Sequence, residues 1–295
     1  MAPATLAPRI GAYLRLIRFQ HTLFALPFAY VGLLLAAQGW PGGATIFWVT
    51  LAMGGARTMA MALNRVIDAR LDALNPRTQD REIPAGVIRP RSALIVALVG
   101  FVAFTVAGLA LNPLTFALLP VATAFLVLYP YAKRFTWACH AVLGVTIGAA
   151  AAGGWIAFAG SFDGAAWLLW LAVAAWIAGF DVIYALLDER FDRQHGVHSL
   201  PARFGPERAR RLAALAHVVA FLAFAAVALV TGQGLIGWLG VGLVGLSFVH
   251  QHRLVARRGA AEALRAFDAN LYVGALVLTS VALDLLWRSF SILSG

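Results

Sequence analysis

The sequence predicts an all-α integral membrane protein with nine transmembrane helices, a cytoplasmic N-terminus and an external C-terminus. Three observations lead to this fold class: the composition, the long uncharged runs and the placement of the basic residues. Of the 295 residues, 61% are hydrophobic and only 12% are charged, with a mean hydropathy of +0.81. Soluble domains have about 25% charged and about half apolar residues, so this composition indicates a chain that lies in a lipid bilayer.

Charged residues divide the chain into uncharged runs that are long enough to hold bilayer-spanning helices. A spanning helix needs about 20 residues, so a run of about 40 should fold as a helical hairpin. The runs cover residues 19–56, 92–132, 135–162, 164–180, 212–252 and 269–283. Turn-forming residues interrupt the hairpins at "QGWPGG" (38–43), "LNP" (111–113), "GSFDG" (160–164) and "TGQG" (231–234). Four such hairpins and a last helix near 269–287 give nine spans.

The basic residues outside the spans gather on one side of this predicted topology. Segments between hairpins carry Lys and Arg, whereas the turns within the hairpins carry none. Cytoplasmic loops are enriched in these residues, which places the N-terminus inside and the C-terminus outside. The residues assigned to the cytoplasmic side are Arg9, Arg15, Arg18, those in 65–91, Lys133, Arg134, and those in 190–211 and 253–265; Arg288 is assigned to the outside.

Three smaller features limit the class further. The net charge of +10 is explained by these loop arginines, so no nucleic-acid partner is expected. The single cysteine, Cys139, excludes a disulfide framework within the chain. The N-terminal stretch "MAPATLAPRIGAYLRLIRF" lacks an apolar core followed by a cleavage site, so no removable signal peptide is expected.

Two polar stretches stand out from this apolar background. The first, "ALNRVIDARLDALNPRTQDREIPAG", covers residues 62–86, and the second, "DVIYALLDERFDRQHGVHSLPARFG", covers 181–205. Both are predicted to lie on the cytoplasmic face, after the second and the sixth span, and to face each other. Their spacing favours two four-helix halves and a ninth helix within one membrane-embedded domain, residues 1–295.

The first stretch aligns oxygen-bearing side chains on one helical face. Asn64, Asp68 and Asp72 follow at i, i+4 and i+8, which places them on one side of a continuing helix. Arg57 lies seven residues earlier on the same face and within a span. A charge in that position is costly unless it is paired, so it is a candidate functional residue.

The second stretch repeats this pattern with Asp181, Asp188 and Asp192, at i, i+7 and i+11. Oxygen-only ligands of this kind suit Mg²⁺, which is held by a few carboxylates together with water and substrate phosphate. Nearby basic side chains could bind phosphate oxygens; these are Arg77, Arg81, Lys133 and Arg134.

The residues alone leave other interpretations open. Mixed charges in a cytoplasmic loop often do no more than interact with solvent. Spacing alone could also describe a membrane transporter or binding protein for a cation or a lipid phosphate. A transporter needs its ionisable groups near the bilayer midplane, whereas these acids are predicted at one membrane surface.

The two stretches resemble the aspartate-rich motifs of the UbiA superfamily of intramembrane prenyltransferases. The segment beginning at Asn64 resembles the first motif, usually N-D-x-x-D-x-x-x-D, and the segment beginning at Asp181 resembles the second, a D-x-x-x-D preceded by an acid within the span. "YPYAKRFT" (129–136) and "RLIRFQHTLFALPFAY" (15–30) resemble further family signatures. The resemblance covers the whole chain and implies a nine-helix bundle that transfers a prenyl group from a diphosphate to an acceptor.

One departure from the first motif is Arg65, which stands where the family usually has Asp. The "NPRT…REIP" run and the "FDR…G-x-HS-x-PARFG" run resemble the menaquinone branch of the futalosine route, whose implied acceptor is 1,4-dihydroxy-6-naphthoate. Proteins of this appearance are also described as 4-hydroxybenzoate polyprenyltransferases. Both acceptors are phenolic carboxylic acids of quinone biosynthesis, and the sequence leaves both open.

The resemblance implies a role for each candidate residue. Asn64, Asp68 and Asp72 are expected to bind one Mg²⁺, and Asp188 and Asp192 a second. Asp181, within the sixth span, is expected to orient or deprotonate the phenol. The diphosphate is expected to contact Arg57, Arg77, Arg81, Lys133 and Arg134, with Arg18 at the start of the first span as a further candidate. The prenyl tail is expected to lie in an apolar channel open to membrane lipid.

Overall fold

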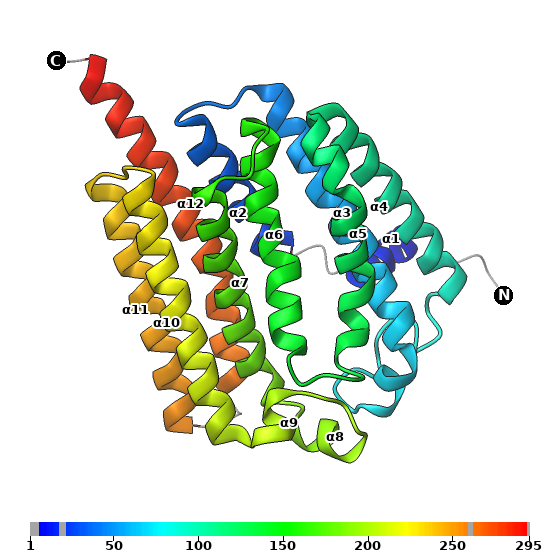
Figure 1. Cartoon of the computed structure of the whole chain (residues 1–295). Coiled ribbons are helices and arrows are strands. Elements are labelled where there is room, and N and C mark those ends of the chain that lie inside the picture. The colour runs from blue at the N-terminus through cyan, green and yellow to red at the C-terminus, as the bar shows by residue number, and fades with distance from the viewer. Residues whose placement is uncertain (1–5, 18–21, 259–261, 294–295) are drawn as a thin grey trace.

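The computed structural model describes residues 6–17, 22–258 and 262–293, and all regular structure in that part of the chain is helical. The helices lie side by side as an elongated bundle (Figure 1). They are α1 (Leu6–Leu16), α2 (Thr22–Ala37), α3 (Gly43–Leu74), α4 (Pro90–Leu111), α5 (Pro113–Ala132), α6 (Cys139–Ala159), α7 (Gly164–Ala185), α8 (Glu189–Gln194), α9 (Leu200–Phe204), α10 (Pro206–Val230), α11 (Leu235–Arg258) and α12 (Ala263–Leu293).

Eight of the described helices are long and apolar enough to cross a membrane, namely α3, α4, α5, α6, α7, α10, α11 and α12. A shorter apolar helix, Ala25–Ala37, lies within α2. The protein is therefore a multi-pass membrane protein. The first predicted span, in the run 19–56, corresponds to this shorter helix, and part of that run lies outside the described residues. The predicted sides of the two termini stay predictions.

The turn residues end the helices where the sequence indicates. All four predicted turns separate consecutive helices: α2 from α3, α4 from α5, α6 from α7 and α10 from α11. Asn112 forms a capping box with Thr115 at the start of α5. Asp163 accepts hydrogen bonds from the backbone N–H groups of Ala165 and Ala166 at the start of α7. These caps satisfy donors that the first helical turn leaves without partners.

The last helix is longer than predicted. We expected a helix near 269–287, whereas α12 runs from Ala263 to Leu293. The prediction followed the uncharged run, so the predicted helix begins only after Asp268. Helical hydrogen bonding continues through charged residues outside the apolar window, so the uncharged run marks only the apolar centre of the helix.

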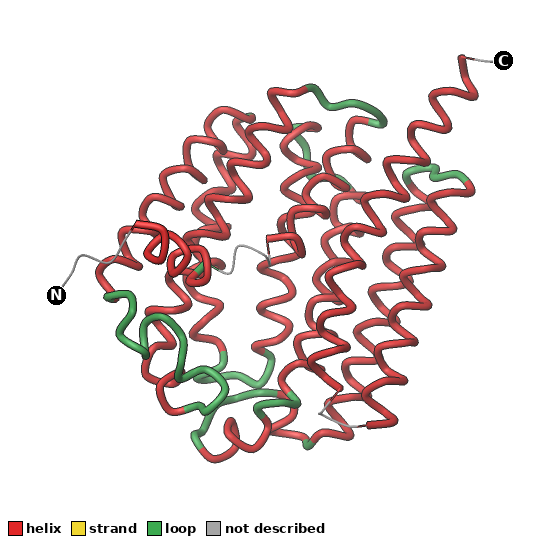
Figure 2. Tube along the Cα trace, turned by 180° about the vertical axis from the view of Figure 1, so that it is seen from behind, coloured by secondary structure: helices red, strands yellow, loops and turns green. Residues whose placement is uncertain are grey.

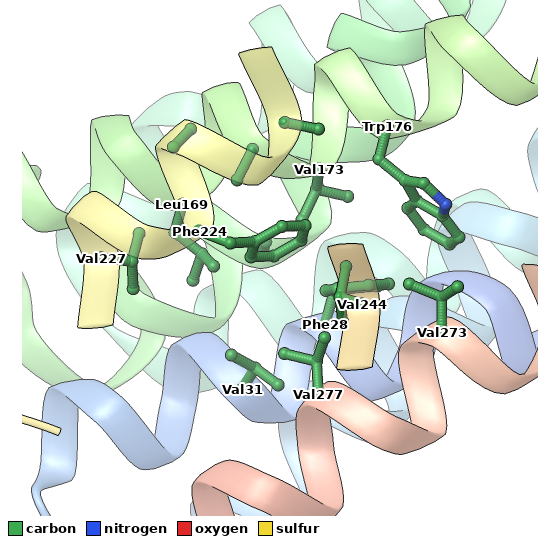
Figure 3. Close-up of a cluster of buried hydrophobic side chains, with 14 of the residues drawn as sticks. Phe28, Val31, Leu169, Val173, Trp176, Phe224, Val227, Val244, Val273 and Val277 are labelled. Atoms are coloured by element: carbon green, nitrogen blue, oxygen red, sulfur yellow. The ribbon is translucent and has the colours of Figure 1, made fainter. Parts of the chain in front are cut away.

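The largest apolar core surrounds α7 (Figure 3). Trp176 of α7 is fully buried, and its ring lies 4.9 Å from that of Phe28 on α2. Val244 of α11 and Val273 of α12 join the same cluster. The first apolar helix therefore packs with the later helices, rather than within a separate four-helix half as expected.

Glycines bring the backbones of α2 and α6 into direct contact. A Cβ added at Gly154 would lie 1.9 Å from the carbonyl oxygen of Ala29, and one at Gly32 would lie 2.0 Å from that of Ala151. Both distances are too short for any side chain. Small residues allow such close approach in membranes, where hydrophobic burial alone does not drive helices together.

The connecting segments are distributed unevenly between the two ends of the bundle. Figure 2 shows most of the loop residues at one end, which also carries α8 and α9. The segment 75–89, between α3 and α4, and the segment 186–205 both lie there. Both polar stretches of the sequence therefore meet at one end of the helices.

Candidate functional site

The acids of the first stretch lie on a single uninterrupted helix, as predicted. Asn64, Asp68 and Asp72 all belong to α3, which continues to Leu74. Asp68 and Asp72 are buried, with only 1% and 6% of their surface exposed. Buried carboxylates are costly unless charged or hydrogen-bonding groups meet them. Their partners therefore decide what this helical face can do.

Basic side chains meet both buried carboxylates. Lys133 Nζ lies 2.5 Å from Asp68 Oδ2, and an Arg134 nitrogen lies 3.6 Å from Asp68 Oδ1. Arg81 pairs with Asp72 Oδ1 at 2.7 Å. Residues predicted to bind phosphate thus contact residues predicted to bind metal. The sequence predicted both the basic and the acidic residues. Which basic side chain pairs with which acid could be seen only in the structure.

The second stretch is not one continuous helix, which corrects the prediction that Asp181, Asp188 and Asp192 share a helical face. Helix α7 ends at Ala185, and the separate helix α8 begins at Glu189. Asp188 is the residue before α8, with a φ of −105° and a ψ of 2°, outside helical geometry. The spacing i, i+7 and i+11 is compatible with one helix, but Asp188 and Asp192 lie beyond the end of α7 and so do not continue its face.

Direct hydrogen bonds join the two stretches, which confirms that they face each other. The Asn75 side-chain amide donates to Asp188 Oδ1 at 3.1 Å. Arg77 Nε donates to the same oxygen at 2.9 Å, and its Nη2 contacts Asp188 Oδ2. Arg77 Nη1 also donates to the Tyr184 hydroxyl at 2.7 Å. Arg77 thus spans the gap between α3 and α7.

The electrostatics of this junction perturb two groups outside the spans. Burial opposes the charge of Arg77, but its hydrogen bond to Asp188 and the nearby acids outweigh that cost and raise its pKa further. Burial raises the pKa of Asp192 to about 6, and the charge of Asp188 raises it while a hydrogen bond from Ser199 lowers it. Asp192 therefore changes charge near neutral pH, unlike an ordinary aspartate.

Asp181 lies deeper than the other acids of its stretch. It belongs to the last turns of α7, which ends at Ala185, whereas Asp188 and Asp192 follow the end of that helix. Its carboxylate Oδ2 lies 2.7 Å from His140 Nδ1 on α6. Sequence reasoning missed His140, because 41 positions separate the two residues and no local spacing relates them.

The remaining predicted residues are distributed as follows. Arg57 lies in α3, within the membrane-spanning part of that helix. Arg65 is buried, and its Nε donates to the Leu16 carbonyl of α1 at 3.4 Å. The departure from the family motif therefore falls on a residue that binds α1. Arg18 lies outside the described residues.

The donor set suits a hard divalent cation. Asp68 Oδ1 and Asp72 Oδ2 are buried and make no hydrogen bond within the described part of the chain. Such oxygens are the ligands that Mg²⁺ prefers. Among the described residues no three His, Cys, Asp or Glu side chains are close enough to hold one ion together. Further ligands would therefore come from Asn64, water or a bound phosphate.

Fold and site together define a polytopic helical membrane protein with a mixed acidic and basic site at one end of its bundle. Residues 25–275 match the UbiA prenyltransferase family. The chain belongs to the UbiA prenyltransferase family and is a prenyltransferase. The transporter interpretation is set aside on this ground.

Curated relatives match almost the whole chain. A 4-hydroxybenzoate octaprenyltransferase from Aromatoleum aromaticum is 32% identical over 291 residues, which cover 96% of this chain and 97% of the relative. A protein of the same name from Nitrosomonas europaea is 32% identical, with 97% and 98% covered. The similarity to each of these two relatives therefore includes both polar stretches of this chain.

Solved structures share the fold. A UbiA homologue from Aeropyrum pernix K1, in its apo form, superposes with a TM-score of 0.83 and 32% identity, covering 90% of this chain and 98% of that one. A UbiA homologue from Archaeoglobus fulgidus, solved with GPP and Mg²⁺, has a TM-score of 0.67 at 18% identity, with 91% and 99% covered. The second likeness concerns the fold alone.

Proposed function

We propose that this protein transfers a polyprenyl group from a prenyl diphosphate to a phenolic aromatic acid in quinone biosynthesis. The acceptor is 4-hydroxybenzoate or 1,4-dihydroxy-6-naphthoate, and the names of the curated relatives favour the first. The observation that carries the proposal is the junction of the two acidic stretches. Arg77, Arg81 and Lys133 form salt bridges there with the carboxylates of Asp188, Asp72 and Asp68 respectively.

The diphosphate is held by the basic side chains that now contact the acids. Arg77, Arg81 and Lys133 are each within reach of a carboxylate, and a diphosphate would compete for the same N–H donors. One arginine side chain can donate two parallel hydrogen bonds to two phosphate oxygens, whereas lysine contributes a compact charge. Arg134 and Arg57 complete this predicted set, and Arg18 stays a further prediction.

The carboxylates hold Mg²⁺ in this proposal. Asn64, Asp68 and Asp72 supply one set of oxygens, and Asp188 and Asp192 supply another. The hydrogen-bond-free oxygens of Asp68 and Asp72 support the first set. When bound, Mg²⁺ neutralises the charge that develops on the leaving diphosphate.

The chain's own residues do the rest of the chemistry. The cationic side chains stabilise the departing diphosphate as its bond to the prenyl carbon breaks. Asp181 lies deeper than Asp188 and orients or deprotonates the phenol of the acceptor. The apolar helices keep water away from the allylic cation, which water would otherwise capture.

The same proposal includes an orientation in the membrane. The protein lies in the cell membrane with the site end of its bundle facing the cytoplasm. The turns at the opposite end carry no Lys or Arg, whereas cytoplasmic segments are enriched in these residues. The substrates are a prenyl diphosphate, which reaches the site through the lipid, and an aromatic acid from the cytoplasm.

The test is a transfer assay with the purified chain in detergent or liposomes. Geranyl diphosphate or a longer prenyl diphosphate is combined with each aromatic acid in turn, and the prenylated product is detected by mass spectrometry. Product with 4-hydroxybenzoate or the naphthoate supports the proposal. Binding of the diphosphate without transfer to any phenolic acid would refute it.

A further inference from the structure

A buried contact between α6 and α7 extends the proposed acceptor site. His140 Nδ1 lies 2.7 Å from Asp181 Oδ2, with the two side chains 5% and 24% exposed. The neighbours of Asp181 on α7, Phe180 and Val182, are 6% and 3% exposed. The Asp181 carboxylate is thus partly accessible between two buried neighbours, and the buried His140 side chain contacts it from α6.

The accessible positions on this part of α7 form one stripe. Ala178, Asp181 and Tyr184 are each partly exposed, and their spacing of three residues keeps them on one side of α7. Asp188 lies just beyond the end of this helix. Asp188 and Tyr184 at the site end contact Arg77. The stripe therefore leads from the proposed diphosphate site down to Asp181.

The two nitrogens of His140 have different partners, which sets its tautomer. The backbone N–H of Leu200, at the start of α9, donates to Nε2 at 3.3 Å. A nitrogen that accepts a hydrogen bond carries no proton, so the ring proton lies on Nδ1 and is donated to Asp181. A histidine that donates its Nδ1–H to a carboxylate stabilises the ionised carboxylate and fixes its direction.

Neighbouring contacts fix His140 in this position. The backbone N–H of His198 donates to the Lys133 carbonyl at 2.7 Å, and Cys139 Sγ donates to the His198 carbonyl at 3.2 Å. These bonds attach the segment before α9 to the connection between α5 and α6. Lys133, in turn, contacts Asp68 through its side chain.

Helix packing does not need this pair. A Cβ at Gly144 of α6 would lie 2.3 Å from the Ala174 carbonyl oxygen of α7, and one at Gly148 would lie 2.8 Å from the Ala174 nitrogen. The two backbones are therefore already in contact through small residues. A polar pair at the end of such an interface can serve a purpose other than holding the helices together.

We propose that His140 is a positioning residue that holds Asp181 ionised and directed at the phenol of the bound aromatic acceptor. The proposal rests on the proposed function. In the reaction, the bond between the prenyl carbon and the diphosphate oxygen breaks, and its electron pair leaves with the diphosphate. A ring carbon ortho to the phenol supplies the electron pair of the new carbon–carbon bond.

The protons balance in this scheme. Asp181 accepts the phenolic proton as the ring attacks, which gives a ketone-like ring with one tetrahedral carbon. The hydrogen on that carbon leaves as a proton to water, and Asp181 returns its proton to the oxygen. The products are the prenylated phenol, diphosphate and one proton, and Asp181 ends as it began.

The experiment compares His140→Leu with His140→Asn, whose side-chain N–H can replace the Nδ1 donor. Steady-state rates with geranyl diphosphate, Mg²⁺ and 4-hydroxybenzoate are measured in detergent, with thermal unfolding as the check of folding. We expect His140→Leu to lower kcat by about 10- to 100-fold, as the loss of a supporting hydrogen bond commonly does, with KM for geranyl diphosphate unchanged. His140→Asn should recover most of the loss, and His250→Leu, at an exposed histidine of α11, should change nothing.

A second measurement separates positioning from a structural role. More acidic phenols, such as 3-fluoro-4-hydroxybenzoate and 3-nitro-4-hydroxybenzoate, need less help to ionise. The ratio of wild-type to His140→Leu rates should therefore fall towards one along that series. His140→Leu should also add no further loss to Asp181→Asn, because both remove the same function.

The outcomes are distinct. A constant rate ratio along the series, or losses that add in the double variant, would overturn the proposal while the proposed function stands. If His140→Leu does not fold, the ratio of wild-type to His140→Asn rates along the same series decides, and a constant ratio above one again overturns the proposal. If the wild type prenylates none of these acids, the proposed function fails first, and diphosphate binding by calorimetry then reports whether the chain is intact.

Discussion

The two acidic stretches of this protein carry similar residues on different supports. In the first, Asp68 and Asp72 lie on α3, which runs without interruption to Leu74. In the second, α7 ends at Ala185, and Asp188 and Asp192 belong to a turn and a short separate helix. One stretch is therefore held by a spanning helix, and the other by a loop attached to its neighbours.

The difference shows up in how each stretch obtains its partners. The carboxylates of α3 meet Lys133 and Arg81, which come to them from other segments. Asp188 instead receives Asn75 and Arg77 from the loop that follows α3. The helix thus provides a fixed face, whereas the loop stretch depends on contacts with the first stretch. We expect changes in the first stretch to have the larger effects.

Metal removal tests what the two stretches share. If both sets of carboxylates act through Mg²⁺, EDTA should abolish prenyl transfer, because the developing charge on the diphosphate is no longer neutralised. Excess Mg²⁺ should restore it. The measurement is product formation before and after chelation and re-addition. Full activity in EDTA would mean that neither stretch holds a required metal.

Substitution of one carboxylate at a time compares how much each stretch contributes to catalysis. We expect Asp68→Ala and Asp188→Ala each to lower kcat/KM by at least about 100-fold, with the larger loss for Asp68, whose buried position leaves no room for a substitute. Asp80→Ala, at an exposed acid in the loop after α3, is the control and should remain active. Near-normal kcat/KM in either folded variant would show that its stretch is dispensable.

Two arginines of α3 are expected to have different roles, Arg57 in binding the diphosphate and Arg65 in stabilising the fold. Arg57→Ala should weaken the affinity for geranyl diphosphate by about tenfold or more, since a hydrogen bond to a charged group is worth about 1.5–3 kcal/mol. Its melting temperature should stay within a few degrees. Arg65→Ala removes a buried contact with Leu16 and should lower the melting temperature with little change in affinity. Calorimetry and thermal unfolding distinguish these results, and the reverse pattern would make Arg57 the structural residue.

The smallest expected effect concerns Asp192. Its pKa is raised from 3.8 to about 6 by burial, so between these values the folded protein binds more protons than the unfolded one. Stability should therefore fall as pH rises from about 4 to about 6 and then level off. Asp192→Asn should lack this part of the pH dependence and be relatively more stable at pH 7. Melting temperatures of both proteins in EDTA across this range test it, and identical curves would contradict the shift.

Much of the fold follows from the sequence, because apolar length and turn residues act locally. The turns at 38–43 and 160–164 end helices as predicted, since Gly, Pro and Asp restrict the backbone at their own positions. The face of α3 that holds Asn64, Asp68 and Asp72 follows from helical periodicity in the same way. Arg57, Asp181 and the other candidate residues keep their assigned roles as predictions.

Features that depend on distant residues were not predictable. Helical spacing suggested that Asp188 and Asp192 continue α7, but the contacts of Asn75 and Arg77 with Asp188 accompany a break in the helix. His140 gave no signal at all, because its partner Asp181 is brought to it only by the packing of α6 on α7. The orientation of Arg65 towards α1 likewise depends on tertiary structure.

The close contact between α2 and α6 has a consequence for how the protein is made. Gly32 and Gly154 leave no space between these backbones, and α2 also packs on α12, the last of the described helices. During synthesis α2 leaves the ribosome before either partner exists. It must therefore wait in the bilayer, or beside an insertion factor, until α12 has been made, so this early apolar helix reaches its final neighbours late.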